Sequence, residues 1–202
     1  MKIMKFAHRC CCSSTVQRHG SQATILTHHK EFLDLVANHE SRHHEDGKIT
    51  LSLRDNIAFI DINNPRKKNS FTGQMMIQLA EIIDELCMNA ENYSTTPCVV
   101  MKAKNCDTFS SGASFDLVKE KINSPERGVL MAEFMTDCLN SLRESPFISS
   151  CFINGPALGG GAELTTFSDF RIITDSPRSR IQFVHALLGA SPGWGGARYC
   201  IY

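Results

Sequence analysis

The sequence has no excess of charge of either sign and no long apolar run. Its 202 residues carry 21 Lys and Arg against 21 Asp and Glu, which gives a formal net charge of zero. No long basic stripe is present, so nucleic-acid binding is set aside. The most apolar segments, such as CVVMKA at 98–103, fall far short of the roughly 18 residues that a membrane-spanning helix needs. The composition therefore predicts one soluble domain with a substantial core.

Several ligand-binding patterns are also missing. The nine cysteines include no C-x-x-C pair, which gives a structural zinc site little support. They are scattered through core-like segments, which favours reduced thiols inside the cell. Neither G-x-x-x-x-G-K-[ST] nor G-x-G-x-x-G occurs, so a nucleotide-phosphate loop is not expected. The sequence thus predicts no metal and no redox cofactor.

Residues 1–30 differ in composition from the rest of the chain, and residues 1–47 are expected to form an N-terminal extension. No acidic residue precedes Glu31, whereas basic and hydroxyl side chains are frequent, as in a mitochondrial transit peptide. An untargeted extension explains the same composition, so a cytosolic and a mitochondrial-matrix protein both remain open. Apolar spacing at 30–38 predicts a short helix, and residues 48–202 are expected to form the domain proper.

Hydrophobic periodicity predicts a layered α/β core. Two alternating segments at 49–55 and 57–63 flank a polar break, which indicates a β-hairpin. An amphipathic helix is expected at 71–89 and another after residue 128, with Val129 facing inward. The remaining elements are expected to be strands at 97–103, 147–154, 170–175 and 180–184 and a short helix from about residue 160. Alternating strands and helices indicate an α/β fold.

Two glycine-containing loops each follow an expected strand and lead into an expected helix. They read FSSGAS at 109–114 and NGPALGGGAEL at 154–164. The start of a helix presents unpaired N–H groups and the positive end of the helix dipole, so two such starts could hold one anionic oxygen between them. Three consecutive glycines are also compatible with close helix packing alone, and both interpretations remain open.

The motifs NNPRKKNSF, FSSGA, NGPALGGGAELTT, DFRI, RIQFV and PGWGG occur in this order. From about residue 48 the sequence resembles the crotonase, or enoyl-CoA hydratase/isomerase, superfamily, and it looks most like the ethylmalonyl-CoA decarboxylases within it. The resemblance implies a crotonase-like spiral of ββα units and an oxyanion hole for a thioester, with the N–H groups of Ala113 and Gly160 as donors. Gly112, Gly159 and Gly161 would leave room for the substrate.

Glu163 and His185 are the candidate acid-base or orienting residues. Hydratases of the superfamily use two glutamates; Glu163 matches the first, and His185 stands where the second is expected. Hydration is therefore disfavoured, whereas decarboxylation needs an oriented carboxylate, an oxyanion hole and a proton donor. Alternatively, Glu163 only complements the dipole of a helix and His185 is a packed core histidine. Ser114, where relatives have Asp, should still cap a helix.

The resemblance also implies how the substrate is held and how subunits assemble. Arg66, Lys67 and Lys68 occupy the loop that approaches the phosphates of coenzyme A in relatives, although a solvated turn explains them too. Coenzyme A is part of the substrate, so no separate cofactor is expected. Complete relatives form trimers or hexamers. The sequence ends at Tyr202, before the further helices that relatives have, so we also consider a non-catalytic remnant that associates with full-length subunits. A hydratase/isomerase is the other alternative to an active carboxy-lyase.

Overall fold

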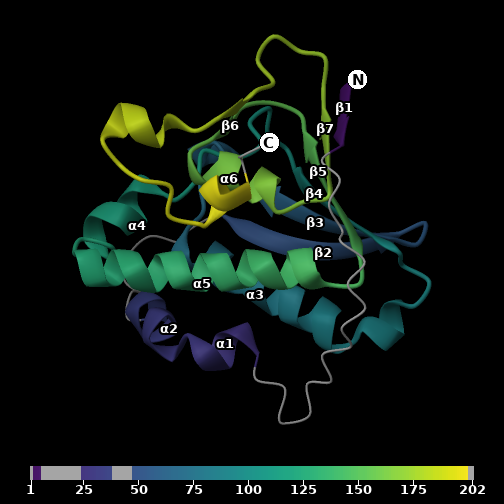
Figure 1. Ribbon diagram of the computed structural model, residues 1–202, viewed down its shortest axis with the longest axis horizontal. Helices are drawn as coiled ribbons and strands as arrows, with labels where there is room; N and C mark the ends of the chain where they lie inside the picture. The colour runs from purple at the N-terminus through teal and green to yellow at the C-terminus, as the bar shows by residue number, and fades with distance from the viewer. Residues whose placement is uncertain (1, 6–23, 38–46, 200–202) are drawn as a thin grey trace.

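A computed structural model describes residues 2–5, 24–37 and 47–199, and most of the segment compared above with a transit peptide lies outside this range. A six-stranded sheet has the order β1-β7-β5-β4-β3-β2 (Figure 1). Strands β3, β4, β5 and β7 are parallel, while β1 and β2 run antiparallel at the two edges. The strands are β1 Lys2–Lys5, β2 Lys48–Arg54, β3 Ile57–Asn63, β4 Cys98–Ala103, β5 Ile148–Ile153, β6 Ala157–Leu158, β7 Phe170–Ile173 and β8 Ile181–Gln182.

Among the described residues six α-helices accompany the sheet, and four of them have a side-chain N-cap. Thr24, Thr72, Ser114 and Ser124 each accept a hydrogen bond from the N–H three residues later. Such a cap stabilises a helix by about 1 kcal/mol. The capping role expected of Ser114 is therefore confirmed. The helices are α1 Ile25–His28, α2 Lys30–Ala37, α3 Gly73–Met88, α4 Phe115–Glu120, α5 Pro125–Glu144 and α6 Gly160–Thr166.

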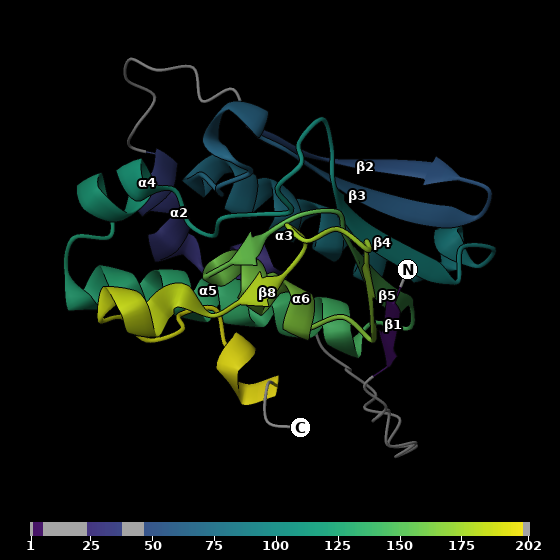
Figure 2. The ribbon, with the colours of Figure 1, turned by 90° about the horizontal axis from the view of Figure 1, so that it is seen from above.

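Helices α3 and α5 lie side by side on one side of the sheet (Figures 1 and 2). Their apolar stripes face alternate residues of the strands, as the periodicity predicts, and each buried Leu, Ile, Phe or Met contributes about 1.5–3 kcal/mol. The α/β layer architecture is confirmed. The core of this layer includes Ile60, Ile62, Met75, Leu79, Ile83, Met101, Phe134, Leu139 and Cys151.

Part of the expected N-terminal extension packs on this core. The ring of Phe32 in α2 stacks on Phe134 of α5 at 4.4 Å between centroids, and Phe32 is 1 % exposed. The carboxylate of Asp84 in α3 accepts hydrogen bonds from the N–H groups of Ile25 and Leu26 at the start of α1. Helices α1 and α2 are thus fixed to α3 and α5, while the domain boundary at residue 48 stays a prediction.

Three local predictions differ from the structure. Helix α5 begins at Pro125 rather than after residue 128, because Ser124 caps it and proline suits a first-turn position. Val129 is 53 % exposed, so its expected inward orientation is wrong; it lies on the side of α5 opposite Cys138. The strand expected at 180–184 is reduced to β8, which pairs with β6 in a separate two-stranded sheet. His185 then lies in a 3-10 turn, Val184–Leu188.

A glycine contact joins the loop after β5 to the loop after β4. A Cβ atom on Gly155 would overlap the backbone carbonyl of Asp107. We expect Gly155→Ala to lower the free energy of unfolding by about 1–3 kcal/mol, the usual range for overpacking. Urea denaturation measures the change, and Gly193→Ala is the matched control because a Cβ there meets no atom within 4 Å. Equal stability of the two variants would contradict the close approach of these loops.

Candidate functional site

The two glycine-containing loops lie against each other, as expected. Ser110 and Ala157 form a parallel β-bridge, and the Leu158 N–H donates to the Ser110 carbonyl at 2.9 Å. A Cβ on Gly161 would collide with that same carbonyl, and a Cβ on Gly112 would lie 2.8 Å from the backbone nitrogen of Gly160. Glycine at both positions lets the two backbones meet.

The peptide group between Gly112 and Ala113 has a fixed orientation. Its carbonyl accepts the Phe71 N–H at 2.8 Å, while the Ser114 N–H donates to the Phe71 carbonyl at 2.8 Å. In a trans peptide the carbonyl and the N–H point in opposite directions, so the Ala113 N–H points away from Phe71. Within the described part of the chain this N–H has no acceptor. Ala113 therefore offers one available donor.

The second expected donor, Gly160, begins α6. The carbonyl of Gly159 accepts the N–H groups of Ala162 at 2.8 Å and Glu163 at 3.1 Å, so it points into the helix. The peptide group between Gly159 and Gly160 is planar, so the Gly160 N–H points opposite to this carbonyl, away from the helix. None of the residues that the structure describes accepts this N–H. Gly159 has φ +56°, which glycine adopts without strain.

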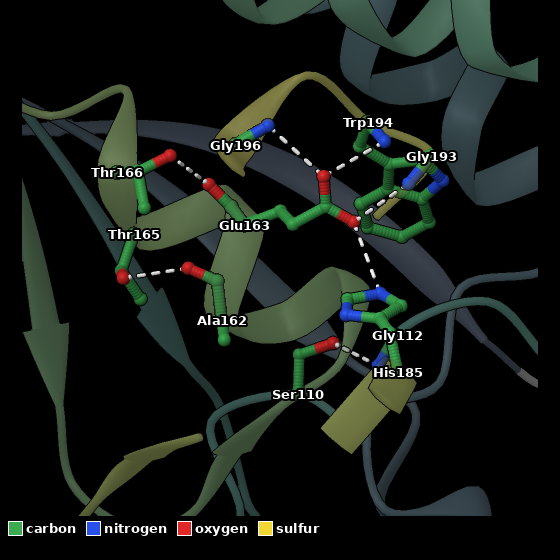
Figure 3. A network of polar contacts seen from close by, with 10 residues as sticks. All are labelled: Ser110, Gly112, Ala162, Glu163, Thr165, Thr166, His185, Gly193, Trp194 and Gly196. Carbon is green, nitrogen blue, oxygen red and sulfur yellow. Dashed lines mark hydrogen bonds and ion pairs between the residues drawn. The ribbon is translucent and has the colours of Figure 1, made fainter. Parts of the chain in front are cut away.

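Glu163 is fully buried in α6, and both of its carboxylate oxygens are occupied (Figure 3). Oε1 accepts the Gly193 N–H at 3.1 Å and lies 3.1 Å from Nε2 of His185. Oε2 accepts the N–H groups of Trp194 and Gly196, each at 2.9 Å. The side chain therefore ties α6 to the 193–196 turn rather than lying at the solvent.

His185 completes this arrangement. Its side chain is 14 % exposed, with Nε2 on Glu163, while Nδ1 is buried and has no partner among the described residues. The Nε2 nitrogen lies near the start of α6, 3.8 Å from the position of a Cβ on Gly159. Glu163 and His185, predicted separately, thus form one pair beside the glycine loop, with Glu163 buried and His185 half-buried (Figure 3).

Trp194 is a site residue that the sequence reasoning did not single out. Its indole is 2 % exposed and packs edge-to-face with Phe71 at 5.7 Å between centroids. A Cβ on Gly160 would lie 2.9 Å from this indole. Gly160 is thus needed first for packing against Trp194, and only then for access to its N–H. The only sequence signal for it was the large apolar side chain in the PGWGG motif, which favours burial.

A cysteine nucleophile has no support in this region. Cys151 on β5 lies beneath α6, with Sγ 3.9 Å from the Leu164 carbonyl and 2.8 Å from the hydroxyl of Ser168. Burial raises the pKa of the Cys151 thiol to about 11. The group is therefore a protonated thiol near neutral pH, and thiols are weak nucleophiles in that form. No cluster of three or more potential metal-ligating side chains occurs among the described residues.

A pocket of about 460 Å³ opens beside the first loop. Lys67 borders it and pairs with Asp116 of α4 at 2.9 Å between Nζ and Oδ2. Arg66 and Lys68 are exposed on the same turn, but they do not border the pocket. Only Lys67 of the three basic residues is thus brought close to Ala113. The pocket is lined by Lys67, Ser70, Ser111, Ala113, Ser114, Phe115 and Asp116.

Comparison with known proteins shows which family this sequence is similar to. The model of the enoyl-CoA hydratase/isomerase family matches residues 52–201. Ethylmalonyl-CoA decarboxylase of Xenopus tropicalis is 46% identical over 158 residues, which are 77% of this chain and 50% of the relative. The Homo sapiens protein of that name is 43% identical over 152 residues, 74% of this chain and 47% of the relative. The chain thus spans about half the length of the curated relatives it matches.

Solved structures share the fold at lower identity. An enoyl-CoA hydratase from Bacillus anthracis superposes with a TM-score of 0.63 at 21% identity, covering 75% of this chain and 56% of that one. Pseudomonas aeruginosa DspI gives 0.61 at 24% identity, with 79% and 62% covered. In the described part of the chain, no helix is long and apolar enough to cross a membrane.

Proposed function

The chain belongs to the enoyl-CoA hydratase/isomerase family, and from that premise we propose that it binds an acyl-CoA thioester and decarboxylates a malonyl-type acyl group, such as ethylmalonyl or methylmalonyl. The family match covers residues 52–201, which include both loops and the Glu163–His185 pair. The relatives that are 42–46% identical carry the name ethylmalonyl-CoA decarboxylase. Their name supports the choice of substrate class.

The observation that carries the proposal is the occupied carboxylate of Glu163. Three backbone N–H groups and His185 surround its two oxygens, which leaves no oxygen to bind and activate a water molecule. The position of a second glutamate is held by His185 itself. Hydration of an enoyl thioester requires such activation, whereas loss of carbon dioxide does not. The site therefore favours decarboxylation over hydration.

In the proposed reaction, the thioester oxygen accepts hydrogen bonds from the Ala113 and Gly160 N–H groups. The bond between the α-carbon and the carboxylate breaks, carbon dioxide leaves, and the electron pair forms an enolate whose charge rests on that oxygen. Two preorganised donors stabilise this charge more than the neutral carbonyl, each by about a hundredfold or more in rate. A proton then returns to the α-carbon and gives the shortened acyl-CoA.

We assign the return of this proton to His185 and its orientation to Glu163. The Nε2–H group donates to Oε1 of Glu163, so Nδ1 is the nitrogen left to carry a proton toward a substrate. Solvent afterwards restores the proton. In this scheme Glu163 is a positioning residue and His185 the proton donor.

Coenzyme A binding and assembly follow from the same family premise. We propose that the thioester enters through the pocket beside Ala113, with Lys67 near the phosphates and exposed Arg66 and Lys68 adding positive potential. Assembly into trimers or hexamers, alone or with full-length subunits, is proposed for the chain as well. No separate cofactor takes part in this scheme.

A substrate comparison tests the reaction. Offered ethylmalonyl-CoA, methylmalonyl-CoA and crotonyl-CoA, the 202-residue protein should release carbon dioxide from at least one of the first two and hydrate the third poorly. Labelled carboxyl carbon measures release, and loss of the enoyl absorbance measures hydration. Efficient hydration would overturn the proposal in favour of a hydratase. Thioester binding without either reaction would identify a non-catalytic subunit.

A further inference from the structure

Asn69 lies in the loop before α3 and is completely buried with every side-chain polar group used. Its Oδ1 accepts the Asn64 N–H at 2.7 Å, and its Nδ2 donates to the carbonyls of Thr108 at 3.0 Å and Phe109 at 3.3 Å. The backbone of Asn69 has φ +52°, a left-handed conformation that Asn tolerates better than most residues. A conformation of this kind persists only where surrounding contacts fix it.

Ser110 connects Asn69 to the glycine turn. Its hydroxyl donates to the Asn69 carbonyl at 2.9 Å and accepts the Gly112 N–H at 3.1 Å. Ser110 is completely buried, and its own carbonyl accepts the Leu158 N–H of the second loop. One hydroxyl thus joins the loop before α3 to the first glycine loop, while the backbone of the same residue joins the second.

The geometry points to Asn69 and Ser110 as positioning residues for the Ala113 N–H, an inference that rests on the oxyanion hole of the proposed function. Gly112 is bound on both sides: its N–H is held by the Ser110 hydroxyl, and its carbonyl by the Phe71 N–H. These two bonds fix φ and ψ of Gly112, and with them the plane that carries the Ala113 N–H. Without the hydroxyl, only the two bonds to Phe71, at the Gly112 carbonyl and the Ser114 N–H, orient that plane.

We call the chain of hydrogen bonds from Asn69 through Ser110 to Gly112 the relay. It matters because it holds the Ala113 donor in place before the reaction begins. A donor stabilises developing charge best when it needs no reorganisation during the reaction. Gly112 has φ +87° and, being glycine, can adopt many other conformations when its N–H is released. The Ser110 hydroxyl therefore restricts the residue next to the donor, and Asn69 in turn orients that hydroxyl.

Ser110→Ala tests the relay, with Ser149→Ala as the matched control. Ser149 is 2 % exposed, and its hydroxyl also makes two hydrogen bonds, donating to Oδ2 of Asp169 and accepting the Asp169 N–H. The probe is butyryl-CoA labelled with ¹³C at the thioester carbonyl. Infrared difference spectroscopy reports the polarisation of that carbonyl, and amide hydrogen exchange reports the order of the loop.

We expect Ser110→Ala to bind the probe but to lose most of the downward shift of its carbonyl band. Exchange at the Gly112 and Ser114 amides should rise about threefold to tenfold, as expected for one hydrogen bond. Ser149→Ala should leave both readouts unchanged. Asn69→Gly keeps the backbone conformation available and removes the side chain, so it should move both readouts in the same direction as Ser110→Ala.

The outcomes separate the relay from the function on which it rests. An unchanged carbonyl band and unchanged Ser114 exchange in Ser110→Ala would overturn the positioning role. A wild-type protein that binds the probe without any shift of the band would overturn the oxyanion hole itself, whatever the variants do. Should Ser110→Ala fail to fold, Asn69→Gly provides the same two measurements, and normal values there equally contradict the relay.

Discussion

Gly112→Ala is expected to abolish carbon dioxide release. The methyl group of alanine would lie 2.8 Å from the Gly160 nitrogen, where it shields this donor from the thioester oxygen. Loss of one such donor costs about a hundredfold or more in rate. Relief of the contact would require the two loops to separate, which displaces the Ala113 donor as well. Turnover of ethylmalonyl-CoA and the carbonyl band of bound butyryl-CoA are the two measurements.

Gly189→Ala is the control for backbone strain. Gly189 also has a positive φ, +66°, but a Cβ there meets no atom within 4 Å. Both variants carry the cost of a left-handed alanine, about 1–2 kcal/mol, and Gly112→Ala should lose more because its methyl group also meets the Gly160 nitrogen. Only Gly112→Ala should lose the reaction. Equal activity in the two variants would remove the Gly112–Gly160 contact from the site.

Glu163→Gln is expected to lower the free energy of unfolding by about 3 kcal/mol or more, because a buried charge-assisted network loses its acceptor. In the wild-type protein the two carboxylate oxygens of Glu163 accept hydrogen bonds from three backbone N–H groups and from His185. A glutamine has one acceptor oxygen and turns an NH₂ group toward some of these donors. Urea denaturation followed by circular dichroism measures the loss.

Glu85→Gln supplies the comparison. Glu85 is exposed and accepts one hydrogen bond, from the Tyr93 hydroxyl at 2.6 Å, so its replacement should cost no more than about 1 kcal/mol. A Glu163→Gln protein as stable as Glu85→Gln, yet inactive, would identify Glu163 as an acid-base group instead of a positioning residue. Loss of stability together with activity supports the assignment made here.

Local patterns in the sequence predicted much of the fold. The hairpin at 49–63 follows from alternation around Asp55 and Asn56, which both adopt the positive φ of a type I′ turn. The apolar spacing after Thr72 likewise predicted α3. The signal failed where it was short or ambiguous. Strand β8 pairs over only two residues, and Val129 was included in the apolar stripe of α5 although the helical repeat places it on the opposite side from Cys138.

The site was predictable in its members but not in their contacts. The resemblance picked out Glu163 and His185, yet Glu163 is bound by N–H groups 30 to 33 residues further along the chain. Every residue except proline has a backbone N–H, so the residue types at 193, 194 and 196 do not reveal that these groups are donors. No motif could therefore have shown that both carboxylate oxygens of Glu163 are occupied. The polar relay through Asn69 and Ser110 was missed for the same reason, since every bond in it has a backbone atom at one end.

The bonds of Glu163 also bear on the order in which the chain acquires its structure during synthesis. Helix α6 has seven residues, all buried, and a helix of that length is marginal in water without tertiary contacts. The donors at 193, 194 and 196 leave the ribosome after α6 does. Until they arrive, the polar side chain of Glu163 in the first turn of α6 has no buried hydrogen-bond donors and favours the solvent. The β-sheet and α3 can therefore form first, and the loop that would hold the thioester is completed only when the 193–196 turn docks.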